Sequence, residues 1–445
     1  MPTTDSKRIL NAFVLLNPEV SWSFKDATRA ETTTLTHSYH RYPAKFIPNI
    51  VEKLVNDFTQ KGDLVLDPFG GCGTTLVESK RLGRKSIGFD INPVAKFIAE
   101  VKVTPINPDQ LKTEFEKLQK RLLNQKKIVN KKHLENERIL YWFEKSTIKE
   151  LDFLYREIKK IKSPRIRKFF LCSFSHNLKN VSRWLMKSIK PTIDKEKVAP
   201  SVKETFLRHT KSMMRKNDQF FNILKEQGNL RTPAHVLLKD STKKFPLNKE
   251  SVDLIVTSPP YVTSYEYADL HQLTLLWFGA DEKDFKNWGR FSSNFVEFRK
   301  NFIGTSYKNT QKGDFGSHIA TKIVNDLQLT DKTLSKNVSN YFIDMNSAFA
   351  EMYRVLKEDS YACVVIGNTQ LTGVDILNAE VAAEQMLKIG FKKHKIIKRE
   401  VGNKMITPWR DTSTGKFTNL KNPNKKCAYE YEYVLIMKKV LHNVA

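Results

Sequence analysis

Asp63-Leu-Val-Leu-Asp-Pro-Phe-Gly-Gly-Cys-Gly-Thr-Thr75 is the stretch of sequence that decides the fold. Its apolar beginning predicts a buried strand, its glycines a sharp turn, and the residues from Thr74 to about Leu82 a helix. A second strand is expected from Lys85 to Asp90, and Pro93 fits the first turn of another helix. A strand, a glycine-rich loop, a helix and a strand in this order indicate an α/β fold with a parallel sheet.

The strand pattern returns later in the chain, after a long helical block. Further strands are expected at His235–Asp240, Val252–Thr257, Tyr361–Gly367, Lys393–Val401 and Tyr431–Met437, with helices at Tyr265–Phe278 and at about 341–357 and 377–389. The sheet is therefore interrupted twice, first by a basic helical block and then by a polar one. We divide the chain into residues 1–104, 105–232, 233–280, 281–338 and 339–445, of which the first, third and fifth parts form one α/β domain.

The charge balance favours a polyanionic partner. The 445 residues include 75 Lys and Arg against 48 Asp and Glu, which gives a net charge of +27. Residues 111–220 alone hold 29 basic and 12 acidic side chains. Such an excess disfavours an ordinary metabolic enzyme and suits a nucleic acid. A hydrophobic content of 40% excludes a disordered chain.

The cysteines and the hydropathy restrict the location of the protein. Cys72, Cys172, Cys363 and Cys427 form no CxxC pair, which argues against a zinc ribbon or a disulfide scaffold. We therefore expect a reducing, intracellular and cytoplasmic setting. The sequence has no run of 18 apolar residues, so no membrane-spanning helix is expected, and its N-terminus does not resemble a signal peptide.

The glycine-rich loop has the features of a nucleoside site. Gly70, Gly71 and Gly73 would let the backbone approach a ligand closely. Asp90 follows Asp67 by 23 residues, at the end of the next predicted strand, where it can accept hydrogen bonds from a ribose. The loop lacks the GxGxxG and GK[ST] patterns that bind phosphates. A nucleoside ligand without phosphates, such as S-adenosylmethionine, fits better; the alternative is an ordinary tight turn.

A second motif, Thr257-Ser-Pro-Pro-Tyr261, directly follows a hydrophobic predicted strand. Two successive prolines fix the backbone and leave bare carbonyl acceptors. The Ser258 hydroxyl and the Pro259 carbonyl could then face an amino group while Tyr261 stacks on the ring that carries it. The alternative is a rigid turn with a core tyrosine.

Together, the two motifs resemble those of the amino-methylating DNA methyltransferases, which transfer a methyl group from S-adenosylmethionine to the exocyclic amine of cytosine or adenine. The resemblance covers roughly residues 35–105, 233–280 and 340–440. It includes the shorter segments His40-Arg-Tyr-Pro-Ala-Lys-Phe46, Asn92-Pro93, Lys239-Asp240-Ser241, Tyr353-Arg-Val-Leu356 and Glu432-Tyr-Val-Leu435. It implies a Rossmann-like methyltransferase sheet, mostly parallel with an antiparallel C-terminal hairpin strand, interrupted by a basic helical insertion and a polar recognition insertion.

The resemblance also assigns roles to residues of both motifs. The catalytic loop would be Ser258, Pro259, Pro260 and Tyr261, with the tyrosine stacked on a base flipped out of the duplex. The cofactor, S-adenosylmethionine, would contact Tyr42, Pro43, Lys45, Asp67, Phe69, Gly70, Gly71, Gly73, Thr74, Asp90 and Asp240. Asp90 would hold the ribose, and Asp240 would lie near the adenine. His37 and His40 have no accompanying cysteine or carboxylate cluster in the sequence, so no metal is expected.

The choice of base and the partners follow from the same resemblance. A serine before the two prolines favours N4 of cytosine in this family, whereas an aspartate favours N6 of adenine, which stays the alternative. The implied partners are double-stranded DNA and a cognate restriction endonuclease. An RNA amino-methyltransferase and an inactive nucleic-acid binder with this fold are the remaining alternatives.

Both insertions are candidates for DNA contact. Basic side chains of residues 158–193 would neutralise phosphates, and they stand among aromatic residues: Arg165, Arg167, Lys168, Lys179, Arg183 and Lys187 with Phe169, Phe170, Phe174 and Trp184. The alternative is a solvated helical face over an ordinary core. The polar block, with Trp288, Arg290, Arg299, Tyr307 and Lys308, is the candidate for base recognition in the major groove. Trp409 and Arg410 could also face DNA.

Overall fold

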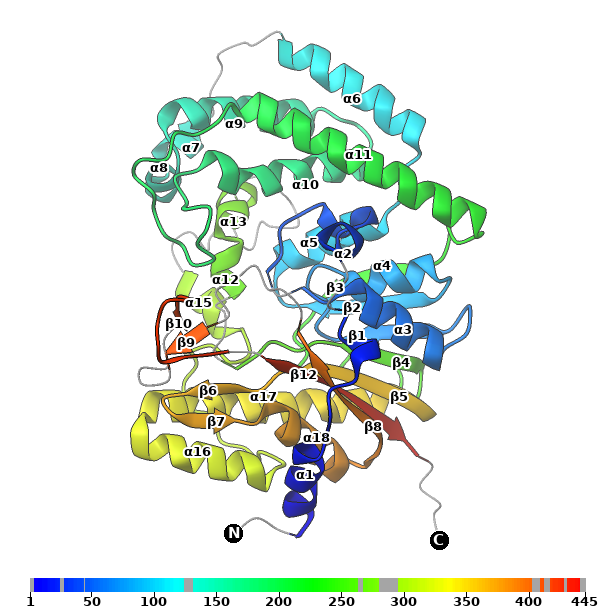
Figure 1. Cartoon of the computed structure of the whole chain (residues 1–445). Helices are drawn as coiled ribbons and strands as arrows, with labels where there is room; N and C mark the ends of the chain where they lie inside the picture. The colour runs from blue at the N-terminus through cyan, green and yellow to red at the C-terminus, as the bar shows by residue number, and fades with distance from the viewer. Residues whose placement is uncertain are drawn as a thin grey trace.

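The computed structural model describes residues 4–24, 28–43, 45–123, 131–262, 267–279, 295–401, 409–411, 417–427 and 430–440. Its centre is a seven-stranded sheet with the order β3-β2-β1-β4-β5-β12-β8 (Figure 1). These strands are β1 (Leu64–Asp67), β2 (Lys85–Asp90), β3 (Ala234–Leu238), β4 (Val252–Thr257), β5 (Leu356–Ile366), β8 (Phe391–Glu400) and β12 (Tyr431–Lys439). The pairs from β3 to β5 are parallel, and β12 is antiparallel to both of its neighbours. The expected mostly parallel sheet with an antiparallel C-terminal strand is confirmed.

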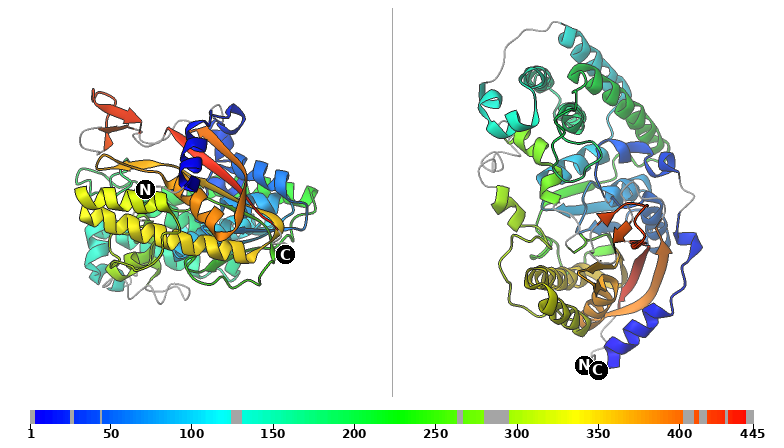
Figure 2. Two further views of the ribbon diagram at one scale, coloured as in Figure 1. Left: turned by 90° about the horizontal axis from the view of Figure 1, so that it is seen from below. Right: turned by 60° about the vertical axis from the view of Figure 1, so that its left-hand side comes forward.

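Helices cover both faces of the sheet. Val65 of β1 joins a core with α3 (Pro48–Phe58), and α4 (Thr74–Arg81) and α5 (Pro93–Val103) continue that layer beside β2 and β3. The next residue, Leu66, points to the opposite face and joins a core with α17 (Lys332–Val355) and α18 (Asn378–Ile389). Helix α16 (His318–Thr330) packs on α17, and Figure 2 shows this pair along one side of the sheet. The apolar runs of the strands thus reflect burial on both faces.

The basic block forms a separate helical layer above the sheet in Figure 1. It comprises α6 (Pro108–Leu123), α7 (Lys131–Glu135), α8 (Glu137–Trp142), α9 (Lys145–Lys159), α10 (Pro164–Val181) and α11 (Val202–Glu226). Helix α13 (Gln272–Phe278), which follows the Thr257–Tyr261 motif, packs into the same core. Phe169, Phe170, Phe174 and Trp184 are all buried there. These aromatic rings therefore support the fold, while phosphate contact by the basic residues stays a prediction.

Smaller elements complete the chain. They are α1 (Thr4–Val14), η1 (Val20–Trp22), α2 (Arg29–Thr32), η2 (Leu35–Ser38), α12 (Tyr267–Leu270), α15 (Phe295–Lys300), the pair β6 (Thr369–Leu371) and β7 (Val374–Ile376), and the sheet of β9 (Trp409–Asp411), β10 (Phe417–Thr418) and β11 (Lys425–Cys427). In the described part of the chain, no helix is long and apolar enough to cross a bilayer.

Two predicted helices need correction. The helix expected at about 341–357 begins nine residues earlier, at Lys332, after Asp331 caps it through the amides of Thr333 and Leu334. Its buried face carries polar residues such as Ser335 and Asn337, which hid the helical period. The helix expected at Tyr265–Phe278 is instead two helices, α12 and α13, which meet at His271; residues 263–266 lie outside the described residues.

Candidate active site

The two sequence motifs meet at one edge of the sheet. Strands β1 and β4 are adjacent and parallel, with Leu66 opposite Ile255, so the loops that follow them emerge side by side. The loops line one cleft, which together with its open mouth measures about 920 Å³. Eleven predicted site residues line it: Tyr42, Lys45, Asp67, Phe69, Gly70, Gly71, Thr74, Asp90, Asp240, Ser258 and Pro260. The remaining four are not among the lining residues. Pro43 and Gly73 are adjacent in sequence to lining residues on the cofactor side, and Pro259 and Tyr261 are adjacent in sequence to Pro260.

The glycine loop forms a narrow turn that no larger residue fits well. Gly70 donates its amide to the Phe89 carbonyl at 2.8 Å, and Gly73 donates to the Gly70 carbonyl at 2.7 Å. Gly71 and Gly73 have φ of +49° and +81°, in the left-handed region that favours glycine. A Cβ atom on Gly73 would lie 2.8 Å from the Cβ of Ala99 on α5. Close packing of loop and helix therefore requires glycine at this position.

Asp67 joins the two motifs from the end of β1. One carboxylate oxygen accepts the hydroxyl hydrogen of Thr257 at 2.7 Å, and the other accepts that of Thr75 at 2.7 Å. The amide of Phe69 also donates to the carboxylate, at 3.1 Å. Burial raises the pKa of Asp67 to about 6, although these three donors favour the ionised form. The carboxylate thus fixes both loops relative to each other.

Asp90 stands at the end of β2 and orders the turn below the cleft. Its oxygens accept the amides of Asn92 at 2.7 Å and of Gly71 at 3.0 Å. Burial raises the pKa of Asp90 to about 7, while the same two amides and others act in the opposite direction. Since each carboxylate oxygen has two lone pairs, Asp90 retains acceptor capacity toward the cleft.

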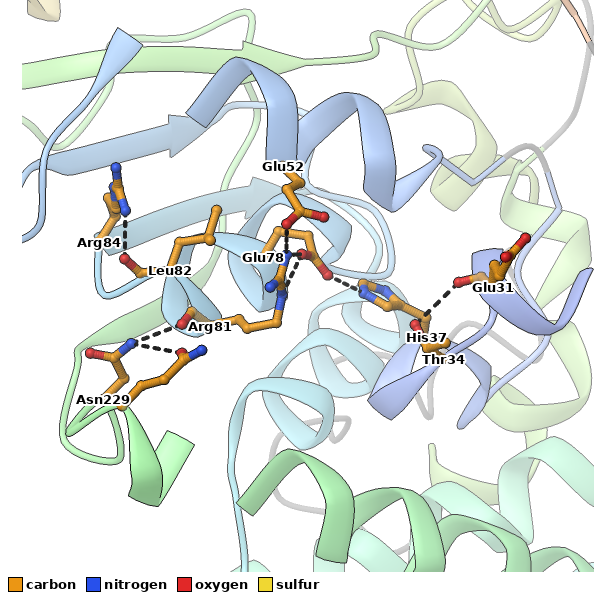
Figure 3. Close-up of polar contacts among 10 residues, drawn as sticks. Glu31, Thr34, His37, Glu52, Glu78, Arg81, Leu82, Arg84 and Asn229 are labelled. Atoms are coloured by element: carbon orange, nitrogen blue, oxygen red, sulfur yellow. Dashed lines mark hydrogen bonds and ion pairs between the residues drawn. The ribbon is translucent and has the colours of Figure 1, made fainter. Parts of the chain in front are cut away.

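The segment before the glycine loop is tied to α4. Buried His37 donates Nε2–H to Glu78 at 2.7 Å, because a carboxylate can only accept. Arg81 bridges the same Glu78 and Glu52 of α3, each at 2.7 Å (Figure 3). Lys45 donates to the His37 carbonyl at 3.3 Å. This network positions the stretch that brings Tyr42 and Lys45 to the cleft.

The neighbouring residue His40 has a structural partner too. It contacts the Ser175 hydroxyl of α10 at 2.8 Å, and its ring stands 5.8 Å from that of His271. Burial lowers the pKa of His37 and of His40. Among the described residues, no group of three or more His, Cys, Asp and Glu side chains is arranged to hold a metal ion.

The Thr257–Tyr261 loop faces the cleft with Ser258 and Pro260. The Tyr261 hydroxyl donates to Glu432 of β12 at 3.1 Å. The wall beside the loop comes from the polar block, because Asn301, Phe302 and Ile303 line the cleft. Of the residues expected to read bases, Trp288 and Arg290 lie outside the described residues, as does the side chain of Arg410. Arg299 pairs with Asp269, and Lys308 with Asp344, and base contact by the polar block stays a prediction.

Ten lining residues were not among the predicted site residues. They are Phe46, Pro68, Cys72, Ile91, Asn92, Lys239, Ser241, Asn301, Phe302 and Ile303. The first seven lie within or beside the quoted motifs, so neighbourhood in the sequence could have found them. Asn301, Phe302 and Ile303 carry no such signal, since they reach the cleft from an insertion without a recognisable motif.

The lining fits S-adenosylmethionine. Gly70 and Gly71 leave a cradle free of side chains, in which a Cβ on Gly71 would lie 3.4 Å from the Tyr42 ring. Asp90 and Asp240 offer carboxylates at the adjacent strand ends of β2 and β3, and Ile91, Phe302 and Ile303 offer apolar surface. Acceptors for hydroxyls beside apolar walls suit a nucleoside.

Comparison with known proteins relates this chain to DNA methyltransferases. The family model described as DNA methylase, for the N6 and N4 enzymes, matches residues 13–101 and 252–442. The Type II methyltransferase M.MvaI of Kocuria varians is 26% identical over 87% of this chain and 88% of its own length. M.BsoBI of Geobacillus stearothermophilus, also a Type II methyltransferase, is 26% identical over 82% of this chain and 81% of its own. A solved SAM-dependent methyltransferase of Methanosarcina mazei aligns over 91% of this chain and 100% of its own, with 10% identity and a TM-score of 0.31.

Proposed function

This chain belongs to the N6/N4 DNA methylase family, and we propose that it methylates N4 of cytosine in duplex DNA. The methyl donor is S-adenosylmethionine, which supplies an electrophilic methyl group on a sulfonium. The observation that carries the proposal is that Ser258 and Gly71, from two motifs far apart in the sequence, line the same cleft.

The catalytic loop would act mainly by orientation. The Ser258 hydroxyl and the Pro259 carbonyl would accept the two hydrogens of the amine, which withdraws its lone pair from the ring and directs it toward the donor. A serine hydroxyl is no general base at neutral pH, so the proton would leave after transfer. Tyr261 would stack on the extruded base and offset part of the cost of flipping.

The cofactor side would be held by the groups around the glycine loop. We propose that Asp90 accepts hydrogen bonds from the ribose hydroxyls, that Asp240 lies near the adenine, and that the backbone of Phe69–Gly73 lines the methionine end. Asp67, which also lines the cleft, supports this arrangement through Thr75 and Thr257. Tyr42, Pro43 and Lys45 would close the opposite wall.

Cytosine is favoured over adenine by Ser258 at the position where adenine enzymes of this family more often carry an acid. The relatives M.MvaI and M.BsoBI are named as Type II methyltransferases, which supports a partner role beside a restriction endonuclease of the same specificity. We further propose that residues 105–232 and 281–338 are insertions in a catalytic domain formed by residues 1–104, 233–280 and 339–445.

The decisive experiment is to map modified bases in DNA from a methylation-deficient host that expresses this chain. We expect N4-methylcytosine within one recurring sequence, and none with the Ser258→Ala variant, which should still bind the cofactor. N6-methyladenine in place of N4-methylcytosine would establish the adenine alternative. Methyl transfer to RNA but not to duplex DNA would overturn the proposal.

A further inference from the structure

A charged pair stands behind the proposed stacking tyrosine. Tyr261 donates its hydroxyl to one carboxylate oxygen of Glu432 at 3.1 Å, and the other oxygen accepts from Arg399. Glu432 and Arg399 face each other across the antiparallel pair of β12 and β8. These two interactions therefore connect the Thr257–Tyr261 loop, through β12, to the edge strand β8.

Arg399 is itself held firmly. Its side chain is fully buried, and it donates to the carbonyls of Trp22 at 2.8 Å and of Ser23 at 2.9 Å. Since a guanidinium donates in a fixed plane, these bonds leave it one orientation toward Glu432. The carboxylate, bonded on both oxygens, is fixed in turn.

The ring of Tyr261 is also confined on its side. A Cβ atom on Gly367, at the end of β5, would lie 3.4 Å from the ring and 3.6 Å from Cγ of Glu432. The absence of a side chain at Gly367 lets the ring lie close to the backbone, while the hydroxyl is bonded at its tip. A ring fixed at its tip and edge presents its face in one orientation.

We propose that Glu432, held by Arg399, is a positioning residue that fixes the Tyr261 ring as the platform for the extruded base. This inference rests on the proposed function, in which Tyr261 stacks on that base. Arg399 is buried and Glu432 is partly buried. Removing such a pair from water is costly, so the pair is weak support for stability alone, whereas its hydrogen bonds hold the Glu432 carboxylate in one orientation. Stacking requires the ring to be oriented correctly before the base binds. Loss of the hydrogen bond between Tyr261 and Glu432 should therefore slow methyl transfer and leave cofactor binding unchanged.

The test is a double-mutant cycle measured as single-turnover methyl transfer from labelled S-adenosylmethionine to unmethylated genomic DNA. Tyr261→Phe removes only the hydroxyl, and Arg399→Met with Glu432→Leu removes both members of the ion pair. We expect each change to slow transfer about tenfold, the effect of one hydrogen bond to a charged group. Combining them should slow transfer no further, because both remove the same anchor.

Further measurements serve as controls. Tyr431→Phe, on β12 with its ring under Lys398 at 4.3 Å, should leave the rate unchanged. The cofactor Kd and the unfolding midpoint of Tyr261→Phe should match wild type, which a merely structural role would not predict for a slowed enzyme.

If Tyr261→Phe transfers methyl at the wild-type rate while Ser258→Ala is inactive, the positioning role is refuted and the proposed function stands. Absence of transfer by the wild-type chain to any DNA would refute the proposed function itself. If the paired replacement does not fold, Tyr261→Phe alone decides the case.

Discussion

Thr257 donates its hydroxyl hydrogen to Asp67 across 2.7 Å, so the residue that begins the Thr257–Tyr261 loop is bonded to the residue from which the glycine-rich loop begins. The two residues end adjacent parallel strands, and both are buried. Because the Asp67 carboxylate also receives Thr75 and the Phe69 amide, one side chain aligns two loops that lie 190 residues apart. The distance between methyl donor and acceptor would depend on this bond.

Replacing Thr257 by Val should therefore weaken two properties at once. The change keeps the side-chain shape but leaves a buried carboxylate with one donor fewer, at a cost of about 1–3 kcal/mol in unfolding free energy. We also expect a higher cofactor Kd and slower transfer. Thr113→Val, at an exposed position of α6, is the matched control and should alter none of the three. Denaturant unfolding and calorimetric titration measure the effect, and unchanged stability of Thr257→Val would contradict it.

Cofactor binding should depend on pH through Asp90. Burial raises the pKa of this carboxyl to about 7 in the free protein, so below pH 7 it is mainly protonated. Only the ionised form can accept hydrogen bonds from both ribose hydroxyls on both oxygens. Affinity should therefore fall as pH decreases below about 7, at most tenfold per pH unit, and should level off above it. Cofactor binding near pH 6 should release a proton, which calorimetric titration in two buffers of different ionisation enthalpy can measure. If the cofactor Kd does not change between pH 6 and 8, Asp90 is not the ribose acceptor.

Glycine is required at position 73 for two reasons, the positive φ and the lack of space for a Cβ atom, and two variants can distinguish them. Gly73→Ala would place a methyl group 2.8 Å from Ala99 and also force alanine to a φ of +81°. Gly228 has a similar φ of +72°, but a Cβ atom added there would have nothing within 4 Å, so Gly228→Ala measures the backbone cost alone, about 1 kcal/mol. We expect Gly73→Ala to cost about 2–4 kcal/mol in unfolding free energy and to weaken cofactor binding. Equal losses for both variants would mean that contact with α5 is unimportant.

The local parts of the site could be predicted because they are short continuous segments. Asp67 to Thr75 and Thr257 to Tyr261 each combine a strand end with a special loop, and parallel strands place such loops at one edge. The contact between Tyr261 and Glu432 could not be found in this way, since it depends on β12 entering the sheet between β5 and β8. The sequence places Phe169 and Trp184 in a basic segment, where they could be expected to contact DNA. Their burial in the core of the helical layer depends on how α10 and the loop after it pack against other helices, which the sequence does not show.

The basic residues of that segment still allow a direct test. Lys187 is exposed in the loop after α10, whereas Lys179 is engaged by the Ser188 carbonyl and the Trp184 ring. If the segment contacts phosphates, Lys187→Gln should weaken DNA binding. The slope of log K against the logarithm of the salt concentration should become shallower by about one. Lys322→Gln, on α16, is the control and should leave both quantities unchanged. A salt slope equal to wild type for Lys187→Gln would remove this residue from the DNA interface.

Phe302 should contribute to cofactor binding although no motif marks it. Its ring lines the cleft and packs edge-on against Phe298, 5.0 Å away, in the core of the helical layer. Phe302→Leu and Phe298→Leu each replace a buried ring in the same cluster, so each should cost about 1–1.5 kcal/mol in unfolding free energy. Only Phe302 borders the cleft, so only its replacement should raise the cofactor Kd, by about three- to tenfold for the apolar area lost. Calorimetric titration of both variants checks this difference. An equal loss of affinity in the two would mean that the cluster acts through global stability, and the wall formed by Asn301, Phe302 and Ile303 would have no direct part in binding.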